Sequence, residues 1–461
     1  MEKIENTVIN GGYCVGCGVC TIHSNSPYKI IKTNYWQYQA VRISKEEDVE
    51  TEEYVAKVCP FSNVSHNEDY LGKELFESNI SSYNKMVGHY VGTYASYTID
   101  DDYRERGSSG GLGSWILVEL FKQKKINGVI HVKDSQQDNL LFEYTISRNI
   151  DDIKSGAKSK YYPVELSNVL QRVKEEDGVY AIVGIPCFIK AVRLLMKEDP
   201  VLGKRIKYCI GLVCGHLKSA HFASMLAWQV GIHPNEINWI DFRTKLKDQS
   251  ADKYAMSASL AKNPSKEYIK SSPMKSLYGG NWGFGFFKYK SCDFCDDVLA
   301  EIADITIGDA WLPQYVSDTK GTNIVVVRNK ELLGILKDAE KNKRIRLIDL
   351  SVNDVVKSQE GGFRHRREGL AYRLQKVNEK DEWYPKKRVQ PGIVINKRTQ
   401  RIQDLRTELR EASHISFMKA IEANSFNLFV SEMSPLIDEY KSLYKPSLIQ
   451  RVKSKIKRLI K

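Results

Sequence analysis

Long apolar runs are absent from this 461-residue sequence, whose most hydrophobic stretches are fragments such as VYAIVGIPCFIKAV. A membrane-spanning helix needs about 20 consecutive apolar residues, so we expect none. The first ten residues, MEKIENTVIN, are charged and lack the apolar core of a signal peptide. These absences predict a cytoplasmic protein, in which the nine cysteines are metal ligands or redox groups rather than disulfides.

An even spread of basic charge is also missing, although the net charge is +12. Residues 386–461 contain 17 Lys and Arg against 7 Asp and Glu, which leaves a net charge of only +2 on residues 1–385. A nearly neutral body has no extended basic surface for binding nucleic acid. We therefore expect no nucleic-acid partner.

Internal repeats and low-complexity segments are absent, so the organisation is read from the motifs and the periodicity. Residues 1–70 form a small cysteine-rich unit with strand-like runs, and residues 71–360 alternate short apolar runs with amphipathic runs. Such alternation predicts an α/β (α+β) body around a mixed sheet. We expect strands over 28–33, 38–44, 90–99, 128–132, 178–185, 206–213, 303–308 and 322–328, and helices over 110–123, 187–197, 219–231 and 330–341.

Residues 361–461 form a basic helical C-terminal extension that ends in an amphipathic tail, PSLIQRVKSKIKRLIK. Five apolar residues of this tail fall on one helical face, and six Lys and Arg fill the other. Such a helix can lie on anionic lipid, as a peripheral contact at the inner face of the membrane. It can equally pack its apolar stripe on the body, and the sequence favours neither interpretation.

A cysteine motif opens the chain. Cys14, Cys17 and Cys20 stand at C-x2-C-x2-C spacing, and the next cysteine, Cys59, is followed by proline. The last cysteine of a bacterial ferredoxin string is also followed by proline. We predict one [4Fe–4S] cluster held by these four cysteines in a ferredoxin-like domain over residues 1–70. Zinc also takes four thiolates, but zinc sites usually pair two C-x2-C hooks.

Four of the five other cysteines fall where a second site can form. Cys187 begins a predicted helix after a strand, Cys214 ends the next strand, and Cys292 and Cys295 make a second C-x2-C hook. Neighbouring strands of an α/β sheet end at one edge, so these cysteines can converge, and helix amides would lower the thiol pKa of Cys187. Isolated cysteines are often core residues, and spacing alone leaves both interpretations open. Cys209 is expected to be a buried apolar residue.

Three polar stretches are candidates for binding a cofactor. The SSGG of residues 108–111 precedes an apolar helix, where free N–H groups suit a phosphate or pyrophosphate, although it is neither a G-x-G-x-x-G fingerprint in register nor a P-loop. The KSK of residues 158–160 brings positive charge to a loop. Asp309 ends a strand at the sheet edge, where a carboxylate can orient a cofactor or cap a turn. The candidate cofactor-binding residues are Ser108, Ser109, Gly110, Gly111, Ser159, Lys160 and Asp309.

Taken in order, the motifs CVGCGVC, CP, RGSSGGLGS, GVI, SKYYPV, VGIPC, GLVC, CDFCDD and ADITIGDAW resemble the beta subunit of the coenzyme F420 hydrogenase/dehydrogenase family, over about residues 10–330. The resemblance implies a flavin- and iron–sulfur-dependent oxidoreductase with two [4Fe–4S] clusters and FAD. It implies that residues 108–111 and 159–160 help to hold FAD beside the second cluster within a domain over residues 71–360. The first domain would then be an electron port. The implied metal ligands are Cys14, Cys17, Cys20, Cys59, Cys187, Cys214, Cys292 and Cys295.

Two features depart from the family. The first domain has cysteines for one cluster where many relatives carry two strings, and residues 365–461 match no family motif. The leading hypothesis is an enzyme that passes electrons through FAD between a hydride donor or acceptor, coenzyme F420 or another soluble carrier or substrate, and ferredoxin-type clusters. Its partner would be a redox protein or a soluble electron carrier.

Two alternatives need fewer cofactors. A non-catalytic electron carrier or redox sensor, such as an accessory protein of surface-polysaccharide biosynthesis, would keep the clusters without flavin. A zinc-stabilised interaction protein with a membrane-tethering tail would need neither iron nor flavin. Measurement of bound iron, zinc and flavin separates the three.

Overall fold

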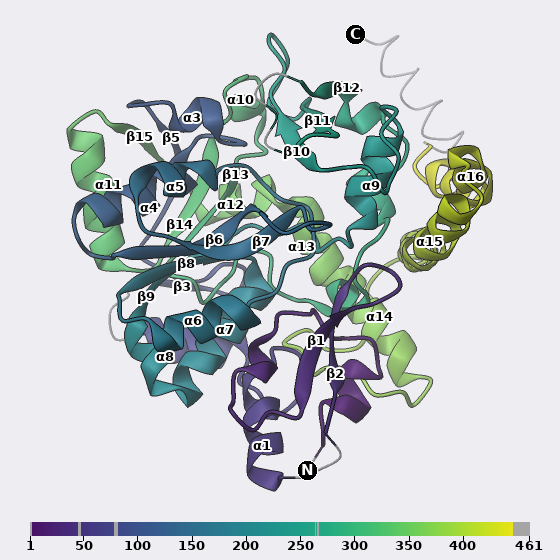
Figure 1. Cartoon of the computed structure of the whole chain (residues 1–461), viewed down its shortest axis with the longest axis horizontal. Coiled ribbons are helices and arrows are strands. Elements are labelled where there is room, and N and C mark those ends of the chain that lie inside the picture. The colour runs from purple at the N-terminus through teal and green to yellow at the C-terminus, as the bar shows by residue number, and fades with distance from the viewer. Residues whose placement is uncertain (1, 45–47, 78–81, 263, 265–266, 446–461) are drawn as a thin grey trace, which may run out of the picture.

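The computed structural model describes residues 2–44, 48–77, 82–262, 264 and 267–445. An eight-stranded mixed sheet lies at its centre (Figure 1). The strands of this sheet are β5 (Gly92–Thr98), β6 (Gly128–Asp134), β7 (Phe142–Ser147), β8 (Tyr180–Gly184), β9 (Ile206–Leu212), β13 (Ile305–Asp309), β14 (Asn323–Val327) and β15 (Ile345–Asp349). Their spatial order is β15-β5-β14-β13-β9-β8-β6-β7, and the α/β class with a mixed sheet is confirmed.

Strand direction brings several loops to one edge of this sheet. β13, β9, β8 and β6 pair in parallel, so their carboxyl ends meet at the same edge. β5 is antiparallel to β14, which is antiparallel to β13, so β5 also ends there. The segments that follow β5, β8 and β9 carry Ser108, Cys187 and Cys214, and Asp309 is the last residue of β13.

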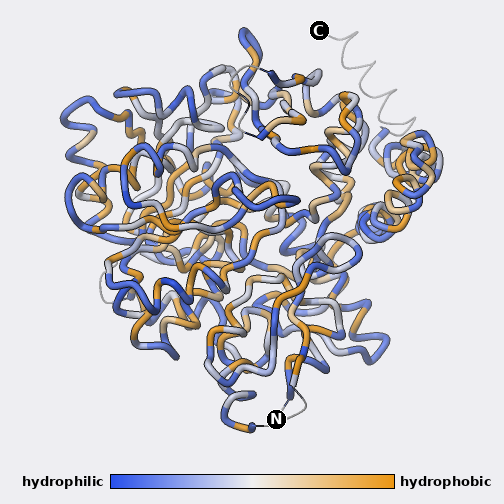
Figure 2. Tube along the Cα trace, viewed as in Figure 1, coloured by the Kyte–Doolittle hydropathy of each residue, from blue (hydrophilic) through white to orange (hydrophobic). Residues whose placement is uncertain are grey.

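Helices cover both faces of the sheet. The helices on one face are α3 (Tyr103–Arg106), α4 (Leu112–Lys122), α5 (Ile150–Ser155) and α11 (Lys330–Lys341), and those on the other are α6 (Ser167–Glu175), α7 (Pro186–Glu198) and α8 (Pro200–Arg205). Side chains alternate along each strand, so Val129 and Ala181 pack with α4 whereas Ile130 and Ile182 pack with α7. Figure 2 shows apolar stretches through the central strands and hydrophilic stretches in the outer loops.

The N-terminal unit lies below α7 in Figure 1 and contains a two-stranded hairpin. Its elements are η1 (Glu5–Ile9), η2 (Val19–Thr21), β1 (Tyr28–Lys32), β2 (Tyr38–Arg42) and α1 (Val49–Val58). Asp48 caps α1 by accepting hydrogen bonds from the amides of Glu50 and Thr51. The chain then continues into the body through α2 (Glu68–Phe76), β3 (Ser82–Asn84) and β4 (Gly88–Tyr90).

The remaining elements lie beside and beyond the sheet. They are α9 (His221–Trp228), β10 (Trp239–Thr244), β11 (Ala255–Ser259), β12 (Ile269–Pro273), η4 (Met274–Ser276), η5 (Trp282–Phe284), η6 (Lys290–Phe294), α10 (Pro313–Val316), α12 (Val352–Ser358), α13 (Glu360–Arg366), α14 (Glu368–Asn378), α15 (Lys397–Glu422) and α16 (Phe426–Ser442). β10, β11 and β12 form an antiparallel sheet that the sequence analysis missed. In Figure 1, α14 lies beside the N-terminal unit, and α15 and α16 form a hairpin at the outer edge.

One apolar core joins the three predicted segments. It contains Val55 from α1, Ile189 from α7 and Phe417 from α15, all fully buried. The domain boundaries at residues 70 and 360 therefore stay predictions. The tail from 446 lies outside the described residues, and no helix among those described is long and apolar enough to cross a bilayer.

Candidate functional site

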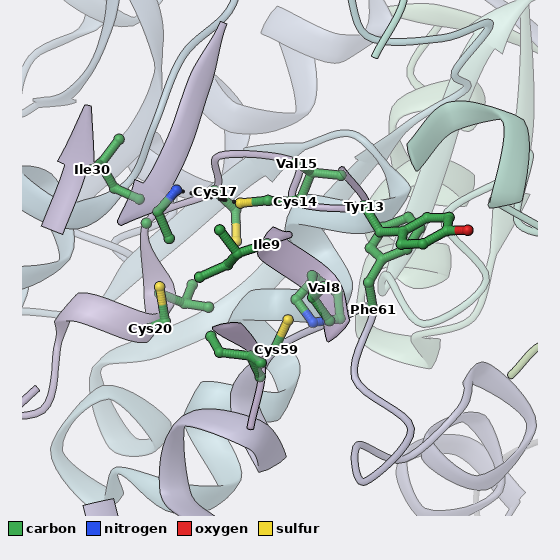
Figure 3. Close-up of a pocket in the computed structure, with 15 residues that line it drawn as sticks. Val8, Ile9, Tyr13, Cys14, Val15, Cys17, Cys20, Ile30, Cys59 and Phe61 are labelled. Carbon is green, nitrogen blue, oxygen red and sulfur yellow. Dashed lines mark hydrogen bonds between the residues drawn. The ribbon is translucent and has the colours of Figure 1, made fainter. Parts of the chain in front are cut away.

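The structure brings Cys14, Cys17, Cys20 and Cys59 around one pocket (Figure 3). Cys14 and Cys17 lie between η1 and η2, Cys20 lies within η2, and Cys59 immediately follows α1. The thiol of Cys20 lies within the electrostatic influence of the other three. The distant Cys-Pro pair thus joins the N-terminal string, and we call these four residues the first cysteine group.

Backbone amides point at the sulfur atoms of the first cysteine group. The amides of Gly16 and Ala40 each donate to the Sγ of Cys14 at 3.4 Å. Gly18 has a φ of +86°, and a Cβ there would lie 2.7 Å from the Oε2 of Glu165. The backbone thus places N–H groups against the sulfur of Cys14, and such hydrogen bonds influence the reduction potential of an iron–sulfur cluster.

Burial governs the electrostatics of the first cysteine group. Burial raises the pKa of Cys59 to about 12 and raises the pKa of Cys20 well above its usual value. Iron or zinc would therefore have to displace these protons on binding. Among the described residues, no three His, Cys, Asp or Glu side chains gather at the spacing of a single metal ion. By donor chemistry, four thiols around an apolar pocket fit a four-iron cluster, which would hold its ligands apart with its own iron and sulfide.

The structure also brings together Cys187, Cys214, Cys292 and Cys295, the second cysteine group. Cys187 lies in the first turn of α7, Cys214 follows β9, and the other two lie in and at the end of η6. The thiol of Cys187 lies within the electrostatic influence of the other three. By contrast, Cys209 is fully buried within β9, as expected.

The expectation for the pKa of Cys187 was wrong. Burial raises this pKa well above the usual value, and the neighbouring cysteines raise it further. The helix-terminal amides are outweighed because desolvation penalises the thiolate. The amide of Leu217 donates to the Sγ of Cys292 at 3.2 Å, and the thiol of Cys295 donates to the carbonyl of Asp297 at 3.4 Å.

The two cysteine groups are neighbours. Cys17 of the first group acts electrostatically on Cys187 of the second. The half-buried Tyr144 lies within the electrostatic influence of both of these cysteines, and the phenol of Tyr289 lies within that of Cys14 and Cys292. Packing of the N-terminal unit on α7 produces this arrangement.

The SSGG segment plays a structural part at the end of β5. The hydroxyl of Ser109 donates to the carbonyl of Thr322 at 2.9 Å, and a Cβ on Gly110 would lie 2.7 Å from the carbonyl oxygen of Ser96. Gly111 has a φ of +85° where α4 begins. Of the four residues, Ser108 alone lines a polar cavity among the described residues, and its Oγ accepts a hydrogen bond from the amide of Ser159 at 2.9 Å. We call this the Ser108 cavity.

Lys160 and Asp309, which were also predicted to bind a cofactor, form hydrogen bonds with other residues of the chain. The ammonium of Lys160 donates to the carbonyls of Gly156, Ala157 and Lys158, and burial lowers its pKa to about 8. Asp309 accepts two hydrogen bonds, of 3.0 and 3.1 Å, from Arg243. Lys160 therefore stabilises its own loop, and Asp309 orients an arginine.

Sequence reasoning missed the cations near Ser108. Arg243 is buried on β10 and donates to the carbonyl of Ser108 at 3.2 Å. Lys245 lines the Ser108 cavity and donates to the carbonyl of Ser109 at 3.2 Å. Lys158 pairs with Asp241 at 3.0 Å. Lys158 lies in a stretch singled out earlier, whereas Arg243 and Lys245 lie in the segment FRTK, at the end of β10 and just beyond it, which matches no motif.

Aromatic side chains connect Arg243 to the second cysteine group. The guanidinium of Arg243 donates to the hydroxyl of Tyr161 at 3.4 Å, and the ring centroid of Tyr161 lies 4.7 Å from that of Trp282. The ring of Trp282 lies 4.6 Å from that of His216, two residues after Cys214. These rings place the Ser108 cavity and the second cysteine group on one side of the sheet edge.

The C-terminal extension supplies cations to the CDFCDD segment. Arg410 pairs with the buried carboxylate of Asp293 at 2.7 Å, and Arg373 donates to the carbonyl of that residue at 2.8 Å. Arg388 pairs with Asp296 and with Glu301. The acidic CDD run was the one sequence feature that could have predicted these arginines, because carboxylates that are buried need cations beside them.

Together, the fold and the site define a class of protein: a mixed α/β sheet whose carboxyl edge carries one four-cysteine group, with a second such group beside it. The N-terminal model of the family "Coenzyme F420 hydrogenase/dehydrogenase, beta subunit" matches residues 93–171, and the C-terminal model matches residues 177–353. The matched residues make up more than half of the chain. The chain belongs to this family, and the predicted resemblance is confirmed.

Three curated proteins are similar in sequence. The beta subunit of coenzyme F420 hydrogenase from Methanococcus voltae is 23% identical over 247 residues, which cover 51% of this chain and 79% of the relative. One subunit of the F420H2 dehydrogenase from Methanosarcina mazei is 25% identical over 225 residues, which cover 48% of this chain and 56% of the relative. Coenzyme F420-dependent sulfite reductase from Methanocaldococcus jannaschii is 23% identical over 366 residues, covering 74% and 50%. The chain thus spans about half the length of the last two.

A solved structure has a similar fold. It is a chain of the F420-reducing [NiFe] hydrogenase complex from Methanosarcina barkeri, with a TM-score of 0.51 and 14% identity. The match covers 66% of this chain and 99% of that one. At this level of identity the match shows a similar fold.

Proposed function

We propose that the chain is an oxidoreductase that holds two [4Fe–4S] clusters and FAD. It passes electrons between a hydride donor or acceptor, coenzyme F420 or another soluble carrier or substrate, and a redox partner protein. The supporting observation is that two four-cysteine groups are neighbours and that the rings of Tyr161 and Trp282 connect the second group to Arg243 at the Ser108 cavity. The names of the three relatives support coenzyme F420 as the first substrate to test.

The ligand assignment follows the two groups. Cys14, Cys17, Cys20 and Cys59 hold the first cluster in a ferredoxin-like unit, and Cys187, Cys214, Cys292 and Cys295 hold the second. When bound, the clusters supply one-electron transfer and the flavin supplies two-electron hydride exchange. The chain itself supplies buried thiols, amides that donate to sulfur, and packing that excludes water.

The flavin site is proposed at the Ser108 cavity. Burial lowers the pKa of Lys245 to about 8, and the neighbouring cations Lys158, Arg104 and Arg243 add to this shift. A bound pyrophosphate would offset that repulsion. Ser108 and Ser159 remain in the proposed flavin site. Lys160 contributes by stabilising the loop that carries Ser159, and Asp309 contributes by orienting Arg243.

Electron transfer between the two groups is supported by their shared surroundings. Tyr144 lies within the electrostatic influence of both Cys17 and Cys187, and burial raises its pKa, so its phenol stays protonated at neutral pH. The hydroxyl of Tyr144 donates to the carbonyl of Val183 at 3.0 Å, which fixes the ring at the end of β8. A fixed, neutral ring keeps water out of the space between the groups.

The first experiment is anaerobic purification with iron, sulfide, zinc and flavin measured on one sample. Two four-iron clusters and FAD predict about eight irons and one flavin per chain. Four irons without flavin would favour the carrier or sensor. Zinc in place of iron would overturn the proposal.

Three cysteine variants test the ligand assignment. Cys59→Ala and Cys187→Ala should each remove about four of the eight irons, and they should remove different spectroscopic signals. Cys209→Ala is the matched control, because this buried cysteine lies outside both groups and should retain all the iron. Full iron content in either of the first two variants would contradict the assignment.

A further inference from the structure

Arg366 lies against the second cysteine group although it comes from outside the family-matched residues, which end at 353. It is the last residue of α13 and is only 2% exposed. Its Nη2 donates to the carbonyl of Gly215 at 2.7 Å, beside Cys214, and its guanidinium also hydrogen-bonds to the thiol of Cys295. The side chain therefore contacts two of the segments that carry the cysteines.

The charge of Arg366 has no carboxylate partner among the described residues, and its buried Nε has no hydrogen-bond acceptor there. The other buried arginines around this segment do have such partners: Arg410 pairs with Asp293 and Arg388 with Asp296. The acidic groups that act on Arg366 are the thiols of Cys295, Cys214 and Cys292, which become anionic when they bind a metal cluster. A buried cation without a counter-charge is costly, so the missing negative charge is expected at those thiols.

Two lysines near the same cysteines do not carry a buried positive charge that lacks a counter-charge. The ammonium of Lys288 pairs with Asp293. Lys218 donates to the carbonyl of Phe286, and burial lowers its pKa well below the usual value, so it can become neutral by losing its proton. A guanidinium remains charged. Arg366 is the group with the largest charge effect on Cys214.

We propose that Arg366 is the counter-ion of the second cysteine group and sets the reduction potential of the cluster proposed there. This inference rests on the proposed function. Cys187, Cys214, Cys292 and Cys295 would hold the cluster, which would supply one-electron transfer: uptake of one electron from the reduced donor would make the site more negative by one charge, with no bond made or broken. The guanidinium of Arg366, within the electrostatic influence of three of the four thiols, would favour the reduced form and so raise the reduction potential.

The test compares Arg366→Gln with Arg364→Gln in the full-length, anaerobically purified protein. Arg364 lies on the same helix, is exposed, and pairs with Glu360 at 3.0 Å. Redox titration followed by electron paramagnetic resonance measures both clusters in one sample. In R366Q, the reduced-to-oxidised ratio of the second cluster at a fixed potential should fall about tenfold, equivalent to about 59 mV for one electron, with the first cluster unchanged. R364Q should match the wild type.

Equal potentials in R366Q and the wild type would overturn the proposal. If R366Q loses iron, Arg366→Lys titrated at a pH below neutral decides, because the low pH keeps the buried ammonium protonated and so retains the charge without the guanidinium geometry. A near-wild-type potential in R366K supports the counter-ion role. A tenfold fall in the reduced-to-oxidised ratio of the second cluster in R366K would overturn that role. Loss of the second cluster from both R366Q and R366K, while R364Q retains it, would also overturn it and would indicate a structural role instead. A wild-type protein without iron would instead refute the proposed function, and the metal analysis detects this first.

Discussion

Replacement of Asp293 by Asn should destabilise the packing of the C-terminal helices on the CDFCDD segment. Asp293 is 1% exposed and lies between Cys292 and Cys295. Its carboxylate pairs with the buried cations of Lys288 and Arg410. The amide of Asn has nearly the same shape but no charge, so the variant leaves two buried cations without their anion.

The structure sets the size of the effect. Burial acts to raise the pKa of Asp293, but Lys288, Arg410 and Arg373 outweigh it and lower the pKa from 3.8 to about 2. At about 1.4 kcal/mol per unit, this shift corresponds to about 2.5 kcal/mol. Removal of one partner of a buried ion pair typically costs about 3–5 kcal/mol. We therefore expect a loss of about 3 kcal/mol at pH 7.

Amide hydrogen exchange on the holoprotein measures this loss locally, as the opening free energy of amides in α14 and α15. Because the folded-state pKa is lowered, the stabilisation is present above pH 3.8 and is lost as the pH falls toward 2. Glu360→Gln, at an exposed pair, is the control and should change the opening free energy by less than about 1 kcal/mol. A loss below about 1 kcal/mol in D293N would refute the reasoning.

Three further predictions concern the other parts of the site. Gly18→Ala should lower the iron content by about half, because a Cβ at this positive φ meets a carboxylate oxygen at 2.7 Å, whereas Gly113→Ala, in open space on α4, should retain all the iron. Arg243→Gln should weaken FAD binding at least about tenfold, as loss of a charge-assisted contact implies, and an unchanged dissociation constant in a fluorescence titration would place the flavin elsewhere. Deletion of residues 446–461 should abolish sedimentation with anionic vesicles if the tail binds lipid, and unchanged sedimentation would exclude that role.

Local sequence patterns were sufficient to predict the framework. Alternating apolar and amphipathic runs predicted β5, α4, β6, β8, α7, β9, α9, β13, β14 and α11, because periodicity is a local property, but they did not predict β7 or the short helices α3, α5, α6, α8 and α10. The predicted helix over 187–197, for example, is α7. Parallel strand ends then predicted that Cys187 and Cys214 meet at one edge. The antiparallel sheet of β10 to β12 was missed because its strands are short and its loops carry no tight-turn signal.

The tertiary structure decided which charged residues are available to bind a cofactor. Lys160 and Asp309 looked free in the sequence, but the structure gives them partners, its own loop for Lys160 and Arg243 for Asp309. The sign of the pKa shift of Cys187 also depended on burial rather than on the helix terminus. Such partners cannot be read from spacing, because they come from segments far apart in the chain.

The sequence by itself determined the spacing of the thiols, the strand order along the chain and the family. Only the tertiary structure decided that the two cysteine groups are neighbours and that Arg366, from the C-terminal extension, lies against the second. The physical reason is burial: a cation removed from water must face a compensating charge, and the chain meets that need with whichever segment the packed core brings close.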